Sequence, residues 1–80
     1  MTRDELIAKI KKASTESDQD FREIISRVLD MDIMTEVEMA EFFDVARPTI
    51  KRWRTGASSP HSYIRGGMYD NLIDKLQQAT

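Results

Sequence analysis

The sequence predicts an all-α fold, a compact bundle of about five helices. Three observations support this prediction. Apolar residues recur at intervals of three and four along most of the chain, which is the period of a helix with one buried face. Gly and Pro number only 3 and 2 among 80 residues, so few positions interrupt that period. Two Thr residues are each followed three positions later by Glu, the pattern of a capping box at a helix start. A chain of this length is expected to form one domain, residues 1–80.

Two helices are expected before residue 30. Residues 2–13 begin with a capping box of Thr2 and Glu5, and their apolar positions are Leu6, Ile7 and Ile10. Lysines near the end of this segment suit the C-terminal end of a helix dipole. The second helix should start after Ser17 and end near Leu29. Its apolar positions give the clearest helical period in the chain and are expected in the core: Phe21, Ile24, Ile25, Val28 and Leu29. Residues 30–34 are expected to be a connector.

Residues 35–55 are expected to form two short helices joined by a tight turn. Thr35 and Glu38 make a second capping box, which starts the first of the two. Asp44 then interrupts the apolar pattern, and Asp tolerates the left-handed backbone that such a turn needs. Pro48 restarts a helix because proline fits the first turn, where an N–H has no partner. Ile50 and Trp53 lie three apart and therefore share one face of the second helix, residues 47–54.

The outer face of that second helix is expected to carry cations. If the direction between Ile50 and Trp53 points inward, the outward positions are Pro48, Lys51, Arg52 and Thr55. Arg47 and Arg54 flank them. A short helix with an apolar inner edge and a cationic outer edge is the form of a DNA recognition helix in a helix-turn-helix. Trp53 is interpreted as a core anchor, and stacking on a base is the alternative.

The net charge of −2 conceals two oppositely charged segments. Residues 14–44 hold ten acidic residues against two arginines, whereas residues 45–69 hold five basic residues and no acid. A polyanion responds mainly to charge within a Debye length, about 8 Å at physiological salt, so the local patch matters more than the total. The distribution favours a nucleic-acid partner at the basic segment; a merely solvated surface is the alternative.

Residues 35–54 also resemble the helix-turn-helix of the lambda-repressor/Cro-like family of phage and bacterial transcriptional regulators. That family has a small residue in the first helix, an apolar residue at the end of the turn, and then a pattern close to S-R-P-T-I-x-R-W. Here Ala40 and Val45 take the first two places, and the segment from Arg47 to Trp53 reads RPTIKRW. Three residues depart from the pattern: Asp44 replaces Gly, Ala46 replaces the N-cap Ser, and Glu36 stands where Gln often contacts a phosphate.

The resemblance implies a sequence-specific regulator, a repressor among the possibilities, that binds a double-stranded DNA operator. Because a domain this small buries only a modest area on DNA, it is expected to act as a homodimer. The recognition helix, residues 47–54, would lie in the major groove. The base-contacting candidates are Pro48, Lys51, Arg52 and Thr55. The phosphate-contacting candidates are Arg47, Thr49, Arg54 and Arg65. Two alternatives remain: a protein-interaction module of the same shape, antitoxin-like or bound through its acidic face, and an accessory protein of excision or recombination.

A last helix is expected over residues 61–78, with apolar positions at Ile64, Met68, Leu72, Ile73 and Leu76. Gly66 and Gly67 lie inside it, so the segment is either one continuous helix, which we favour, or two shorter ones. Its apolar side is expected either to cover the core or to form part of a dimer interface.

Catalysis finds little support in the sequence. His61 is the one histidine, cysteine is absent, and no spacing suggests a metal site or a catalytic triad. No glycine-rich loop joins a strand to a helix, so a nucleotide or other cofactor is not expected. We therefore expect a protein that is not an enzyme. The lack of cysteine and of a long apolar run fits a cytoplasmic location with no membrane partner.

Overall fold

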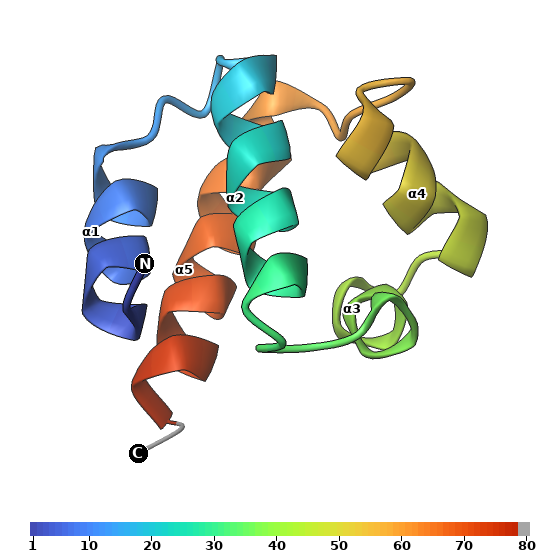
Figure 1. Ribbon diagram of the computed structural model, residues 1–80. Coiled ribbons are helices and arrows are strands. Elements are labelled where there is room, and N and C mark those ends of the chain that lie inside the picture. Colours follow the sequence, from blue (N-terminus) through green and yellow to red (C-terminus); the bar gives the residue numbers. More distant parts are fainter. Residues whose placement is uncertain (79–80) are drawn as a thin grey trace.

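The computed structural model, described over residues 1–78, contains five helices and no strand in that range (Figure 1). The helices are α1 Arg3–Lys12, α2 Asp18–Asp30, α3 Glu36–Phe43, α4 Arg47–Thr55 and α5 Ser62–Gln78. In Figure 1, α2 and α5 occupy the middle of the bundle, α1 lies at one side, and α3 and α4 lie at the other. Contacts join α3 to α4, α2 to α4, and α1 to both α2 and α5. The predicted all-α bundle is confirmed.

The helix starts follow from the capping residues in the sequence. Thr2 and Thr35 each accept a hydrogen bond from the backbone N–H three residues later, and the Glu at that position accepts one in return. Ser17 caps α2 by accepting from the N–H of Asp20. Ala46 gives α4 no side-chain cap, which is the expected consequence of Ala at that position. Pro48, in the first turn of α4, partly offsets this because it needs no N–H partner.

The core is centred on the apolar stripe of α2. All five residues predicted to form this stripe are buried, and Phe21, Ile24, Ile25 and Val28 are fully covered. Every other helix contributes buried side chains to the same cluster: Leu6, Ile10, Met39, Ala40, Ile50, Trp53, Met68, Tyr69, Leu72 and Leu76. Met34, in the connector before α3, is buried with them. Covering a single Leu or Ile side chain contributes about 1.5–3 kcal/mol, so this cluster dominates the stability of the bundle.

The first turn of α5 differs from its expected pattern. The helix runs unbroken through Gly66 and Gly67, but Ile64 is 48% exposed and Arg65 is only 3% exposed. The reason is helical register. Arg65 lies three and four residues before Met68 and Tyr69, so it shares their inward face, whereas Ile64 is turned about 100° away. The apolar side of α5 therefore begins with the aliphatic stem of an arginine.

Asp44 takes the left-handed conformation expected for the turn between α3 and α4, with φ 56° and ψ 51°. An L-residue there is strained by about 1–2 kcal/mol, less for Asp than for most, and Gly relieves that strain. We expect Asp44→Gly to raise the free energy of unfolding by about 0.5–1 kcal/mol, because the relief exceeds the extra entropy that Gly loses on folding. Urea unfolding measures it. Asp70→Gly, inside α5, is the control and should lower stability by about 1 kcal/mol. A loss of stability in Asp44→Gly would contradict the strain argument.

Tyr69 carries a buried hydroxyl that has no hydrogen-bond partner within residues 1–78. An unsatisfied buried polar group costs about 1–3 kcal/mol, so Tyr69→Phe should leave the stability unchanged or raise it.

Burial also raises the pKa of Tyr69 above its usual value. Because the folded state then disfavours the phenolate, stability is full below the unfolded pKa, about 10, and falls as the pH rises above it. Thermal melts between pH 8 and 11 should show this fall in the parent and a weaker one in Tyr69→Phe; identical profiles would contradict it.

Candidate functional site

The inner edge of α4 is anchored in the core. Ile50 is fully buried and Trp53 is 5% exposed. The Trp53 ring packs edge-on against Phe21 of α2, with centroids 5.4 Å apart, and against Phe43 of α3, at 5.9 Å. This T-shaped packing fixes both the position and the rotation of α4 relative to α2 and α3. Trp53 is thus a core residue, and the alternative in which it stacks on a base is wrong.

The opposite edge of α4 faces solvent. Four residues predicted to point outward are all exposed: Pro48, Lys51, Arg52 and Thr55. Thr55 donates its hydroxyl proton to the carbonyl of Arg52 at 3.3 Å. Neither Lys51 nor Arg52 forms an ion pair with any residue of the described range, 1–78. Two cations are therefore presented on one exposed helical edge, and neither is held in an ion pair within residues 1–78.

Three residues flank this edge. Arg47 is exposed at the start of α4, Thr49 is half-buried, and Arg54 is exposed near the end. Arg54 forms an ion pair with Asp30, the last residue of α2. Both side chains are about half exposed, so the pair contributes little to stability, roughly 0.2–1 kcal/mol. Its main effect is to hold the Arg54 guanidinium on the side of α4 that faces α2.

Arg65 does not belong to this surface. Its guanidinium lies inside the bundle, 5.4 Å from the centre of the Phe21 ring, and it donates hydrogen bonds to four oxygens. These are the carbonyls of Pro60 and Thr15, at 3.0 Å each, the Asp18 carboxylate, and the Ser59 hydroxyl. The prediction that Arg65 contacts phosphate is therefore wrong. The residue instead ties the loop after α4 to the start of α2, and its burial follows from the register of α5.

A wide, shallow groove of about 540 Å³ runs along one flank of α4. It is lined by Arg47, Pro48 and Lys51 of α4 and by Glu36 at the start of α3. Two cations and one carboxylate therefore meet in it. The negative charge of Glu36 opposes an anionic ligand at that end of the groove.

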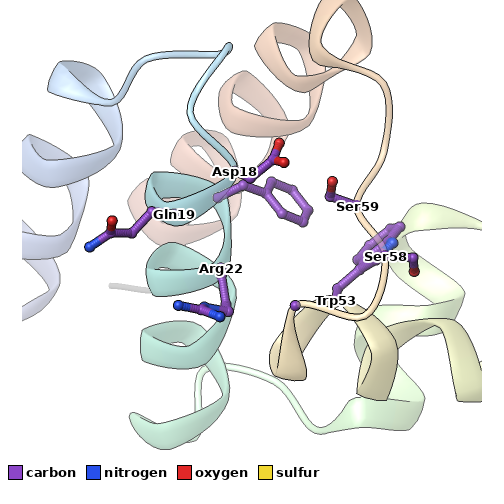
Figure 2. Close-up of a pocket in the computed structure, with 8 residues that line it drawn as sticks. Asp18, Gln19, Arg22, Trp53, Ser58 and Ser59 are labelled. Carbon is purple, nitrogen blue, oxygen red and sulfur yellow. The ribbon is translucent and has the colours of Figure 1, made fainter.

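A smaller pocket of about 180 Å³ lies between α2 and the loop that follows α4 (Figure 2). Figure 2 shows Asp18, Gln19 and Arg22 on α2, Trp53 on α4, and Ser58 and Ser59 on that loop. Asp18 and Ser59 both accept hydrogen bonds from Arg65, so two of its polar walls are already paired. No sequence pattern indicates this pocket, because its walls come from segments far apart in the chain.

The carboxyl groups of Glu5, Glu23 and Glu38 have a lowered pKa, and none of them lines the groove formed by Arg47, Pro48 and Lys51. The pKa of Glu38 is lowered chiefly by the hydrogen bond from the backbone N–H of Thr35, and Glu5 is affected in the same way by Thr2. The pKa of Glu23 is lowered chiefly by its hydrogen bond with Lys9, at 2.9 Å. These groups serve helix caps and one ion pair. Among the described residues, no group of three or more His, Cys, Asp or Glu side chains is placed to hold a metal ion.

Two arginines that are not among the candidate residues of the sequence analysis lie next to α4. Arg22 and Arg27 of α2 line a groove together with Arg54. Both lie within the acid-rich segment, residues 14–44, where the charge pattern along the chain suggests no binding role for them. The signal that points to them is three-dimensional: α2 packs directly against α4.

No helix within residues 1–78 combines the length and the apolar character that crossing a membrane requires. Comparison with protein-family models, with curated proteins and with solved structures finds no match to this chain.

Proposed function

We propose that this protein is a sequence-specific double-stranded DNA-binding transcriptional regulator, and that α3 and α4 act as its helix-turn-helix. The observation that carries the proposal is the orientation of α4. Ile50 and Trp53 fix its inner edge in the core, while Lys51 and Arg52 project from its outer edge with no carboxylate partner among the described residues. A protruding helix with this division of residues fits the major groove of B-DNA, which is about 12 Å wide.

The outer residues suit the contacts that read base edges. Arg and Lys donate to the O6 and N7 acceptors of guanine, which is the commonest specific contact in the major groove. Lys51 and Arg52 are therefore proposed to read guanines. Pro48 and Thr55 offer apolar surface, and the Thr55 methyl group suits contact with a thymine methyl. Arg47, Thr49 and Arg54 lie at the flanks of α4 and are proposed to hold phosphates, which fix the register without reading the sequence.

Two copies are proposed to act together. A domain of this size contacts few base pairs, and a twofold dimer doubles the site it reads. Its two recognition helices would enter successive major grooves about 34 Å apart. The acid-rich remainder of the surface would oppose unspecific association with DNA and orient the approach of α4. A cytoplasmic repressor of phage or bacterial type is the form of regulator that we propose.

Selection of bound duplexes from a random pool tests the proposal. We expect enrichment of a G-containing consensus with two half-sites related by inverted symmetry. Binding to that consensus should weaken steeply with salt, because each phosphate contact contributes about 0.9 to the slope of log K against log salt. The proposal would be overturned if no sequence were enriched from the pool and if binding of the protein to duplex DNA did not weaken as salt rises.

A protein-interaction module is the second candidate, and one observation favours it. Val37 and Phe42 of α3 are large apolar side chains that remain partly exposed, beside the acids Glu38 and Glu41. Such a surface suits an apolar and basic partner. The candidate predicts that no duplex is enriched from a random pool and that Phe42→Ser abolishes binding to that partner. Salt separates the two functions, since an apolar interface does not weaken steeply as salt rises.

A further inference from the structure

A groove of about 190 Å³ runs between α2 and the C-terminal half of α4. Its walls carry three arginines, two carboxylates and a hydroxyl: Arg22, Arg27, Arg54, Glu23, Asp30 and Ser26. All but Arg54 come from α2, where they lie on successive turns of the exposed side. The groove therefore extends the cationic surface of α4 onto a neighbouring helix.

The two carboxylates of the groove are already engaged. Glu23 pairs with Lys9 of α1 at 2.9 Å, and Asp30 pairs with Arg54. Within residues 1–78, Arg22 and Arg27 form no ion pair. An anion that enters the groove would thus meet two guanidinium groups whose charge is not taken up by a partner, and guanidinium forks bind phosphate oxygens in bidentate fashion.

Arg22 is held close to the end of α4. Gly56, the residue that ends this helix, has φ 83°, and a Cβ placed on it would come within 2.7 Å of Arg22 Nη1. The absence of a side chain at Gly56 lets the guanidinium lie against the backbone there. Arg22 therefore packs at the junction of the two helices and is not simply a surface side chain pointing into solvent.

The groove opens on a flank of the proposed recognition helix. At about 100° per residue, Arg54, Arg47 and Lys51 follow one another around the same side of α4. Arg54 lines the groove against α2, and Arg47 and Lys51 line the wider groove against α3. An α-helix with its side chains is about 10–12 Å across and nearly fills a major groove. Elements packed beside α4 on this flank would then meet the sugar-phosphate backbone.

We infer that Arg22, Arg27 and Arg54 form a binding site for the phosphates of one DNA strand. The inference rests on the proposed DNA-binding function and adds a second helix, α2, to the contact surface. In the DNA-free protein the Asp30 carboxylate occupies Arg54, and a backbone phosphate takes over this pairing on binding. Arg22 and Arg27 bind neighbouring phosphates and contribute equally on every sequence, because phosphate contacts carry no base information.

The test compares two double variants of equal charge. Arg22→Gln with Arg27→Gln removes the α2 cations, and Lys11→Gln with Lys12→Gln removes two exposed cations from α1, at the opposite side of the bundle (Figure 1). Binding to the selected duplex is measured against salt by fluorescence anisotropy. We expect the α2 variant to weaken binding to all sequences and to flatten the slope by about 1.8, and the α1 variant to leave the slope nearly unchanged.

Equal slopes for the two variants would overturn the inference while leaving the proposed function standing. Failure of the parent to bind any duplex would instead overturn the proposed function. Circular dichroism melts check that each variant is folded under the binding conditions, which is expected because all four substitutions are at exposed helix positions.

Asp30 provides a second, independent test of the inference. Replacing Asp30 by Asn keeps the shape of the side chain and removes the charge that competes for Arg54. We expect Asp30→Asn to bind the duplex more tightly than the parent at every salt concentration, and Asp74→Asn, on the exposed side of α5, to have a smaller effect. Weaker or unchanged binding in Asp30→Asn would contradict the place given to Arg54 in this site.

Discussion

Replacing Trp53 by alanine is expected to lower the free energy of unfolding by about 3–5 kcal/mol. The indole is 5% exposed and lies between the rings of Phe21 and Phe43, so its removal opens a cavity where α2, α3 and α4 meet. Small domains are stable by only about 5–15 kcal/mol, so this loss is a large share of the total. Urea unfolding followed by circular dichroism measures it.

Two variants serve as controls for the Trp53 prediction. Trp53→Phe keeps an aromatic ring against Phe21 and should lose clearly less stability than Trp53→Ala. Tyr63→Ala removes an aromatic residue that is 79% exposed, and it should change stability by no more than about 0.5 kcal/mol. A stable Trp53→Ala protein would mean that α4 is held mainly by other contacts. Its outward orientation, on which the proposed function depends, would then need another explanation.

The parts of the fold that were predictable are those set by residues close together in the chain. The stripe of α2 follows from apolar residues three and four apart, and the starts of α1 and α3 follow from Thr and Glu three apart. The left-handed turn at Asp44 and the end of α4 at Gly56 are also local features. Each depends on hydrogen bonds or packing within one or two turns, so local sequence suffices to indicate it.

The errors in the candidate site come from contacts between distant residues. Arg65 is one of the five basic residues in the acid-free segment 45–69 and is for that reason predicted to contact phosphate. The register of α5 turns it inward, and Thr15 and Asp18, some fifty residues earlier in the chain, supply acceptors for its buried guanidinium. The pairing of Arg54 with Asp30 spans 24 positions. The register of α5 indicates only that Arg65 faces inward. Its acceptors, and the partner of Arg54, have no periodic signature, since these residues meet only after α2, α4 and α5 have packed.

The same reasoning explains why Arg22 and Arg27 were missed. Charge counted along the chain places them in a strongly acidic segment, whereas charge counted in space places them beside Arg54. A ligand responds to the second arrangement because screening removes contributions from beyond about 8 Å. Linear charge patterns therefore located the main basic segment but not its extension onto α2.

Replacing Arg52 by alanine is expected to weaken binding to the selected operator by about 1–3 kcal/mol, or roughly 5-fold to 150-fold. The side chain is exposed on the outer edge of α4, forms no ion pair within residues 1–78, and would donate to two acceptors of one guanine. Losing that contact should also relax the preference at a single base pair. Anisotropy titrations against the operator and its single-base variants measure both effects.

Arg54→Ala is the matched control for Arg52→Ala, because it removes the same type of side chain from the same helix. As a flank residue it should weaken binding to all sequences alike and reduce the salt slope by about 0.9, leaving base preference unchanged. If Arg52→Ala instead lowered affinity uniformly and Arg54→Ala altered one base position, the rotation assigned to α4 in the groove would be wrong. The two arginines are two positions apart, which places them about 160° apart around the helix, so one rotation cannot give both a base contact. Their contrasting effects would thus fix the rotation of α4 about its own axis when bound to DNA.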